Sequence, residues 1–150
     1  QDPYPKGANG IAFCKNSFDE LYQPECCGKE VISSLGIKES AARSEYDSPA
    51  DLFFALLKQG VAFVNISHSI NNKSNEQLIK DQEYNIQFIS KAKSIVVLGK
   101  SDTLKLFLDY HPDIQISETL IHPSGYNKRN RYEQWSEIWK SNYLNKYLTQ

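Results

Sequence analysis

The sequence predicts an α/β protein of three layers, in which helices cover both faces of a central, mostly parallel sheet. Short apolar runs typical of buried strands alternate along the chain with stretches of helical character. The chain has 150 residues, of which 40% are hydrophobic and 12% aromatic. This is enough apolar surface for one domain with a packed core, spanning residues 1–150.

The N-terminal third of the chain shows no long periodic pattern. Residues 1–47 contain four glycines, three of the six prolines and only short apolar runs, so we expect mainly loops, with a small amount of local structure. A helix is then predicted over about 49–58. Ser48 can cap it, Pro49 suits its first turn, and Gly60 follows its end.

Strands and helices are predicted to alternate from there to the C-terminus. Apolar runs rich in β-branched and aromatic residues indicate strands, and the apolar stripes between them indicate helices. The last of these helices carries tyrosine and tryptophan at spacings of three or four, a face that we interpret as core packing. The predicted elements are a strand over 61–66, a helix over 75–92, a strand over 94–99, a helix over 103–110, a strand over 114–121 and a helix over 132–148.

Composition excludes several classes of protein. The 17 Lys and Arg nearly balance the 18 Asp and Glu, so the chain is neither a basic nor an acidic tail. No apolar run is long enough to cross a bilayer, and no export signal is visible, so we expect no membrane role. The three cysteines form no C-x-x-C pair, which favours a reduced, intracellular location in cytoplasm or nucleus and no metal site.

One feature concerns the start of the chain. The chain contains no methionine and opens directly on Gln1, so we expect a natural N-terminal region upstream of it.

In sheets of this kind the functional residues collect where the strands end. The polar residues at those places are Asn65, Gly99 with Ser101, and His122 with Ser124.

Three short segments carry distinctive motifs. They are Gln1-Asp2-Pro3-Tyr4 with the stretch that leads to Phe13, the predicted strand that ends in Asn65, and His122-Pro123-Ser124. In order and spacing they resemble family 1 uracil-DNA glycosylases, over most of the chain from residue 1 to about 140. The Asp-Pro-Tyr-Pro loop resembles that of the poxviral branch, whose members also serve in replication. The resemblance implies the α/β/α fold of that family.

The resemblance also implies a role for each matching residue. Asp2 would position or activate the water that attacks the sugar, and Gln1, which begins the same loop, would bind the substrate. His122 would donate to the base as negative charge builds on it. Tyr4 would exclude thymine, Phe13 would stack on the flipped base, and Asn65 would pair with the polar edge of uracil. Ser124 would hold a DNA phosphate.

These residue types suit the chemistry. A base inside a duplex must be extruded before an enzyme can reach it, at a cost of a few kcal/mol, and an aromatic floor returns about 1–3 kcal/mol of that cost. Breaking the glycosidic bond develops opposite charges on sugar and base, which one carboxylate and one donor can stabilise. We therefore expect no cofactor. The partner is uracil-containing DNA, and we expect a monomer, with any replication protein or inhibitor unidentified.

The sequence departs from the family at several positions. Pro5 and Asn9 stand where histidines are usual, and Gly125-Tyr126 stands where the family places Pro-Leu, so Tyr126 could be the wedge that fills the space of the flipped base. Lys128 and Arg129, with Arg131, could meet phosphates or form a solvated surface loop. Two alternatives therefore stay open, a DNA-binding or replication-associated module and a glycosylase for another modified base.

Overall fold

The structure, a computed structural model, describes residues 11–65, 80, 83 and 85–148. Contacts divide these residues into two compact units. The sheet unit consists of the described residues of 64–120, and the helical unit consists of residues 11–63 and 121–148. The sequence-based prediction of a single domain stays a prediction.

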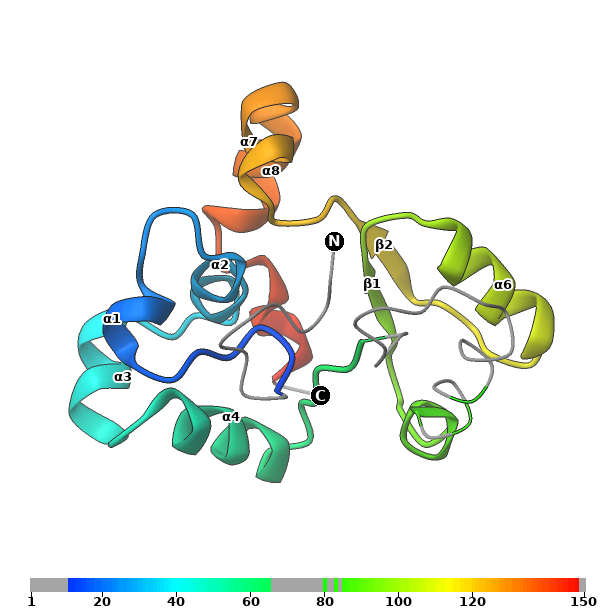
Figure 1. Cartoon of the computed structure of the whole chain (residues 1–150), viewed down its shortest axis with the longest axis horizontal. Helices are drawn as coiled ribbons and strands as arrows, with labels where there is room; N and C mark the ends of the chain where they lie inside the picture. The colour runs from blue at the N-terminus through cyan, green and yellow to red at the C-terminus, as the bar shows by residue number, and fades with distance from the viewer. Residues whose placement is uncertain (1–10, 66–79, 81–82, 84, 149–150) are drawn as a thin grey trace. The chain divides into compact units, whose positions relative to one another are not determined.

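The sheet unit contains a strand–helix–strand segment. Strands β1 (Val96–Leu98) and β2 (Glu118–Leu120) pair in parallel, with Val96 opposite Glu118. Helix α6 (Asp102–Tyr110) connects the two strands and lies beside them (Figure 1). The strands predicted around 94–99 and 114–121 and the helix predicted over 103–110 are thus confirmed, although both strands are shorter than expected.

Local signals explain the ends of these elements. The Ser101 hydroxyl accepts a hydrogen bond from the Leu104 amide at 3.1 Å and so caps α6. Gly99, with φ of 95°, turns the chain directly after β1, and its amide donates to the Leu120 carbonyl at 2.8 Å. The same positive φ would strain any other residue there.

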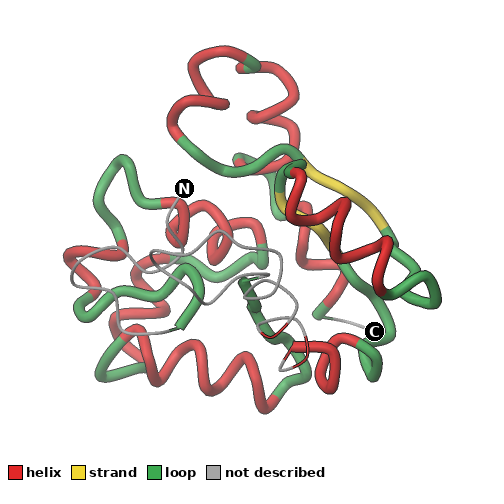
Figure 2. The backbone as a smooth tube through the Cα atoms, turned by 45° about the vertical axis from the view of Figure 1, so that its right-hand side comes forward, coloured by secondary structure: helices red, strands yellow, loops and turns green. Residues whose placement is uncertain are grey.

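Two predictions in this part of the chain need correction. The strand expected over 61–66 is wrong for its described part, because residues 61–65 form no strand and Ala62 and Val64 are exposed. The described residues 80, 83 and 85–89 are helical, as predicted, but 90–92 are not, and the rest of that prediction lies outside the described residues. The described chain is therefore a mixture of helices and a small sheet of two parallel strands, drawn in red and yellow in Figure 2.

The first half of the helical unit holds four helices. They are α1 (Phe18–Leu21), α2 (Cys27–Ser34), α3 (Glu39–Glu45) and α4 (Pro49–Lys58). The helix predicted over 49–58 is confirmed, with Ser48 as its cap. The expectation of loops over 1–47 is wrong for most of 18–45, because helices of four to eight residues are too short to show a clear period and gain their stability by packing.

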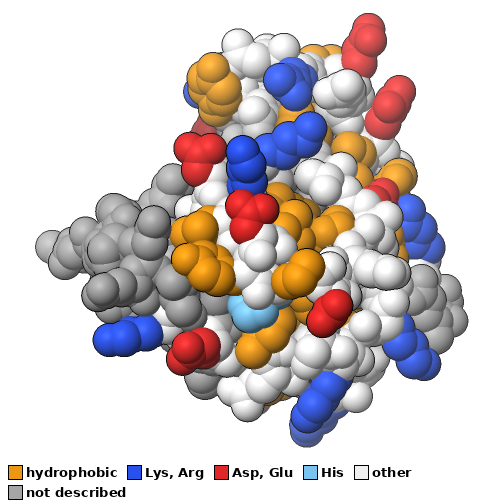
Figure 3. All heavy atoms as spheres, turned by 90° about the vertical axis from the view of Figure 1, so that its right-hand side faces the viewer, with side chains coloured by type: hydrophobic (Ala, Val, Ile, Leu, Met, Phe, Trp, Pro, Cys, Tyr) orange, Lys and Arg blue, Asp and Glu red, His pale blue; other side chains and the backbone are white. Residues whose placement is uncertain are grey.

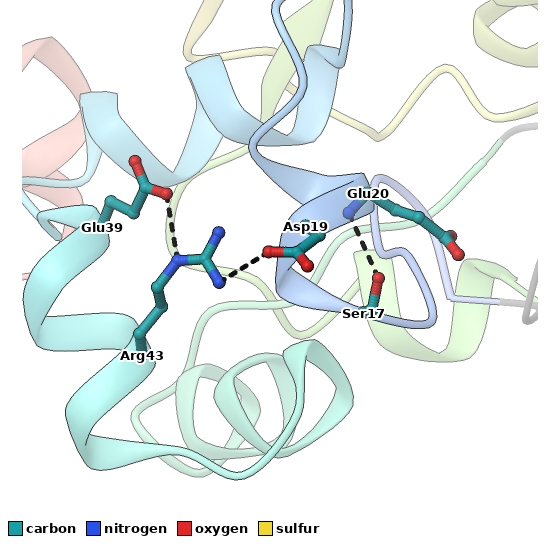
Figure 4. A network of polar contacts seen from close by, with 5 residues as sticks. All are labelled: Ser17, Asp19, Glu20, Glu39 and Arg43. Atoms are coloured by element: carbon teal, nitrogen blue, oxygen red, sulfur yellow. Dashed lines mark hydrogen bonds and ion pairs between the residues drawn. The ribbon is translucent and has the colours of Figure 1, made fainter.

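A polar network joins α1 to α3. The Arg43 guanidinium lies 3.0 Å from carboxylate oxygens of both Glu39, in its own helix, and Asp19, in α1 (Figure 4). The same guanidinium lies over the rings of Phe18 and Tyr22, at 5.9 and 5.6 Å from their centroids. The Arg43 side chain thus contacts both of these short helices.

The C-terminal part of the helical unit contains α7 (Gly125–Asn130), α8 (Tyr132–Trp139) and the 3₁₀ helix η1 (Tyr143–Tyr147). The single helix predicted over 132–148 is wrong in its extent, since α8 ends at Trp139. The prediction that its aromatic face packs in the core is confirmed for Trp135 and Trp139, whose side chains are each 1% exposed. It is wrong for Tyr132, which is 57% exposed.

Helix α2 is joined to α8 and η1 through one buried hydroxyl. Ser34 in α2 donates from Oγ to the Ile138 carbonyl at 3.3 Å and accepts from the Leu144 amide at 3.2 Å. A fully buried hydroxyl with both roles satisfied costs little to bury and fixes these segments against one another.

Candidate functional site

Two side-chain hydrogen bonds hold the backbone at the start of the His-Pro-Ser segment. The buried indole of Trp139 donates to the Ile121 carbonyl at 3.0 Å, and the Asn127 side chain donates to the His122 carbonyl at 3.1 Å. Pro123 is buried. Because α8 and α7 each supply one of these donors, the direction of the His122 side chain depends on how both helices pack.

The His122 imidazole is half-buried. Burial lowers the pKa of His122 below its ordinary value of 6.5, since a charged imidazolium loses hydration there. The neutral form of the ring is therefore favoured at neutral pH. A neutral imidazole has one N–H to donate and one nitrogen lone pair to accept with.

Phe13 lies in an unusual backbone conformation, with φ of 65°. For a bulky residue this left-handed region is strained, so the surrounding structure must hold it. Gly28, in the first turn of α2, provides the contact. A Cβ at residue 28 would overlap the Phe13 carbonyl oxygen and come within 2.9 Å of Leu21. Only glycine allows this approach.

The Phe13 ring belongs to an aromatic group that includes His122. Its centroid lies 6.2 Å from that of the His122 imidazole, with 36° between the ring planes, and 6.0 Å from Phe63 in an edge-to-face arrangement. Phe63 in turn lies 5.5 Å from the buried Phe53 of α4. Residues from both ends of the sequence therefore meet at a half-buried phenylalanine and a half-buried histidine.

The residues predicted to contact DNA lie on and around α7. Ser124 caps this helix by accepting from the Asn127 amide at 3.3 Å, and Tyr126 is 67% exposed. The Lys128 ammonium lies 5.0 Å from the centroid of the Trp135 ring, and Arg129 is exposed. The two cations and the tyrosine are thus presented by one short helix that directly follows His122.

The remaining predicted site residues are not among the described residues of the helical unit. Asn65 belongs to the sheet unit, where its carbonyl accepts a hydrogen bond from the buried Asn85 side chain at 2.5 Å. Gln1, Asp2 and Tyr4 lie outside the described residues. The part of the site that the structure describes is therefore the pair Phe13 and His122 together with α7.

A pocket of about 360 Å³ opens beside α7. Its lining combines carboxylates, cations and aromatic side chains, and it includes Trp135, whose buried indole N–H has no hydrogen-bond partner among the described residues. The residues that line it are Pro24, Glu25, Cys26, Glu30, Pro123, Gly125, Lys128, Arg129, Tyr132 and Trp135.

Reasoning from the sequence missed three contributors to this site: Gly28, Asn127 and Trp139. A glycine at the start of a helix is a weak hint of a close approach, because alanine would favour the helix more. Nothing in the sequence indicated that the indole of Trp139 or the amide of Asn127 would bind the backbone next to His122. Such contacts depend on tertiary packing.

Within the described ranges, no group of three His, Cys, Asp or Glu side chains is arranged to hold a metal ion. No helix in the same part of the chain is long and apolar enough to cross a membrane. On the face drawn in Figure 3, side chains of both charge signs lie close together with hydrophobic ones between them, so neither sign dominates that face.

Comparisons with models of protein families, with curated proteins and with solved structures find no match for this chain.

Proposed function

We propose that this chain is a monofunctional uracil-DNA glycosylase, which hydrolyses the bond between uracil and deoxyribose after base flipping and leaves an abasic site. The fold that goes with this proposal is a three-layer α/β/α arrangement, to which β1, α6 and β2 would contribute. The observation that carries the proposal is the 6.2 Å separation of the Phe13 and His122 rings. The resemblance assigns one of them to the face of the base and the other to its edge.

In the proposed reaction the bond between C1′ and the base nitrogen breaks, and its electron pair leaves with the base. Negative charge then builds on the uracil oxygen, where a hydrogen bond from His122 stabilises it. Positive charge builds on the sugar, and water activated by the Asp2 carboxylate completes the hydrolysis. Phe13 offsets part of the cost of unstacking the base.

The burial of His122 supports this role. Since burial lowers its pKa, the ring enters the reaction neutral and donates a hydrogen bond without carrying a charge of its own. A donor that is already in place needs no reorganisation as the charge develops. The backbone contacts from Trp139 and Asn127 supply that placement.

Base selection in this proposal rests on Tyr4 and Asn65. An amide side chain offers both a donor and an acceptor, so it matches the edge of uracil and leaves polar groups unpaired against a different edge. Tyr4 excludes the methyl group that distinguishes thymine. The contacts to DNA come from Ser124, Tyr126, Lys128 and Arg129.

The alternative of a DNA-binding module without chemistry draws on the exposed residues of α7. Tyr126 together with Lys128 and Arg129 would suit binding to nucleic acid even if no base were cleaved. A glycosylase for another modified base would use the same two residues, Phe13 to stack on the base and His122 to donate a hydrogen bond to it.

One experiment separates these functions. Oligonucleotides that carry a single U, T or C are incubated with the 150-residue chain or its Asp2→Asn variant, and strand breaks are measured after alkali. Cleavage at U alone, lost in the variant, is the expected result. DNA binding without cleavage at any base would contradict the enzyme and favour the binding module, and full activity of Asp2→Asn would contradict the assigned mechanism.

A further inference from the structure

Helix α4 has one side that packs inside the helical unit and another that faces solvent. On the solvent side Phe54 is 54% exposed and Leu57 is 55% exposed. Exposed apolar side chains that lie next to each other, unlike single ones, indicate an interaction surface. The residues that α4 buries instead are Pro49, Leu52, Phe53 and Leu56.

Four residues on the solvent side of α4 form one stripe along the helix. They occupy positions i, i+3, i+4 and i+7, which are neighbours on a helix surface. From the start of the helix the stripe reads acidic, large apolar, small apolar and basic. We call the α4 stripe the residues Asp51, Phe54, Ala55 and Lys58.

The charges at the two ends of the α4 stripe are exposed. Among the described residues, neither Asp51 nor Lys58 forms an ion pair. Asp51 accepts a hydrogen bond from the Ser48 hydroxyl at 3.0 Å, which leaves its negative charge in place. The stripe therefore presents a negative charge at one end and a positive charge at the other.

This order of residues makes the α4 stripe complementary to itself. A two-fold axis between Phe54 and Ala55 would pair two α4 helices antiparallel, with Asp51 of each copy opposite Lys58 of the other. The same axis sets Phe54 of each copy over Ala55 of the other, so that a large side chain meets a small one. A parallel pair would instead set like charges against each other.

The surface beside the α4 stripe contains a hollow of about 530 Å³. Tyr46, which precedes the helix, and Leu57 extend its lining beyond the stripe. A phenylalanine ring from a second copy that lies over Ala55 would bury apolar surface in this hollow. The full lining is Tyr46, Asp51, Phe54, Ala55, Leu57 and Lys58.

We propose that α4 is a self-association surface: two copies of this chain pair antiparallel through it, with Phe54 of each in the hollow of the other and Asp51 of each beside Lys58 of the other. A contact between two ten-residue helices is small beside the roughly 1,200–2,000 Å² that stable interfaces bury. The dimer is therefore weak, and the monomer expected from the sequence is the form at low concentration. The proposal does not depend on the chemistry at Phe13 and His122.

The test is sedimentation velocity of the 150-residue chain at concentrations from about 1 µM to about 1 mM. The mass should rise towards that of a dimer as concentration increases. Phe54→Ser should weaken association by about ten-fold or more. Tyr126→Ser removes an aromatic ring that is 67% exposed on α7, and it should associate like the wild type. Circular dichroism verifies that each variant is folded.

Charge variants test the antiparallel geometry. Asp51→Lys and Lys58→Asp should each weaken self-association, because each sets like charges opposite one another in a pair of identical chains. An equimolar mixture of the two variants should associate about as strongly as the wild type, since every charge then faces its opposite. The difference between the mixture and the single variants should shrink as salt screens the charges.

Three results would overturn the proposal. The first is a chain that stays monomeric over the whole concentration range, which would leave the solvent side of α4 to a different partner or to none. The second is association that Phe54→Ser leaves unchanged. The third is a mixture of Asp51→Lys and Lys58→Asp that associates no more strongly than either variant alone, because the pairing would then not be antiparallel.

Discussion

The backbone carbonyl of Phe13 lies against the Cα of Gly28, closer than any residue with a side chain would permit. The contact joins the segment that carries Phe13 to the first turn of α2 and helps to hold Phe13 at a φ of 65°. The position of a side chain central to the proposed site therefore depends on the absence of a side chain in a neighbouring helix.

Gly28→Ala tests this contact. Helix propensity alone predicts that alanine would stabilise α2 by about 1 kcal/mol. We expect instead a loss of about 1–3 kcal/mol in the free energy of unfolding, because the new methyl group overlaps the Phe13 carbonyl. Urea denaturation measures the change. Ser33→Ala, a substitution later in the same helix, should change stability by only a few tenths of a kcal/mol. A stabilised Gly28→Ala protein would show that the contact does not constrain the chain.

The two tryptophans of α8 form a matched pair. Each is 1% exposed, but among the described residues only the Trp139 indole has a hydrogen-bond acceptor, the Ile121 carbonyl at 3.0 Å. Replacing either by phenylalanine removes similar ring volume. We expect Trp139→Phe to lower the free energy of unfolding by about 1 kcal/mol more than Trp135→Phe does, since it leaves a carbonyl unsatisfied. Equal losses in denaturant titrations would mean that the hydrogen bond contributes nothing net.

Because the pKa of His122 is lowered in the folded protein, we predict that stability depends on pH. Its pKa is lowered by burial below 6.5, so as pH falls through 6.5 the unfolded chain takes up a proton that the folded protein resists. The unfolded state then binds more protons, and the free energy of unfolding decreases as pH falls. Well above pH 6.5 the ring is neutral in both states and contributes no slope.

The check is denaturation of the wild type and of His122→Gln on both sides of pH 6.5. The wild type should lose more stability on acidification than the variant. Parallel curves for the two proteins would contradict the burial of the ring, whatever the absolute stability of the variant.

We predict that replacing Tyr126 affects excision from duplex DNA more than excision from single strands. It is 67% exposed in α7, and as the wedge it would fill the space of the flipped base only in a duplex. Tyr126→Ala should therefore reduce uracil excision from duplex DNA by about ten-fold or more, with a smaller effect on single strands. Tyr110→Ala removes a tyrosine that is 51% exposed in α6, and it serves as the control. An equal loss on both substrates would assign Tyr126 to general DNA contact.

The sequence predicted those elements that carry their own signals. Helix α4 has a serine cap and a proline in its first turn, and α6 has a serine cap, so both could be located from local chemistry. The strand expected over 61–66 failed because β-branched and aromatic residues indicate only that a segment can pair. Residues 61–65 have no partner strand in the described part of the chain.

The residues of the candidate site also differ in how far the sequence pointed to them. The resemblance assigns Phe13 and His122 to the same base, which stays a prediction, and the structure shows their ring centroids 6.2 Å apart. No sequence pattern indicated the other contacts, which are the close approach at Gly28, the hydrogen bond from Trp139 and the position of Glu25 at Gly125. Each joins segments that are distant along the chain, and such contacts follow from tertiary packing rather than from local pattern.

The single-turnover rate of uracil excision, compared between the wild type and His122→Gln, tests the proposed function most directly. His111→Gln, which alters a histidine of the sheet unit with no assigned role, is the control. We predict measurable excision by the wild type, a loss of about 10²–10³ in His122→Gln with DNA affinity retained, and no loss in His111→Gln. Excision that is unchanged in His122→Gln, or absent from the folded wild type on every uracil substrate, would contradict the proposal.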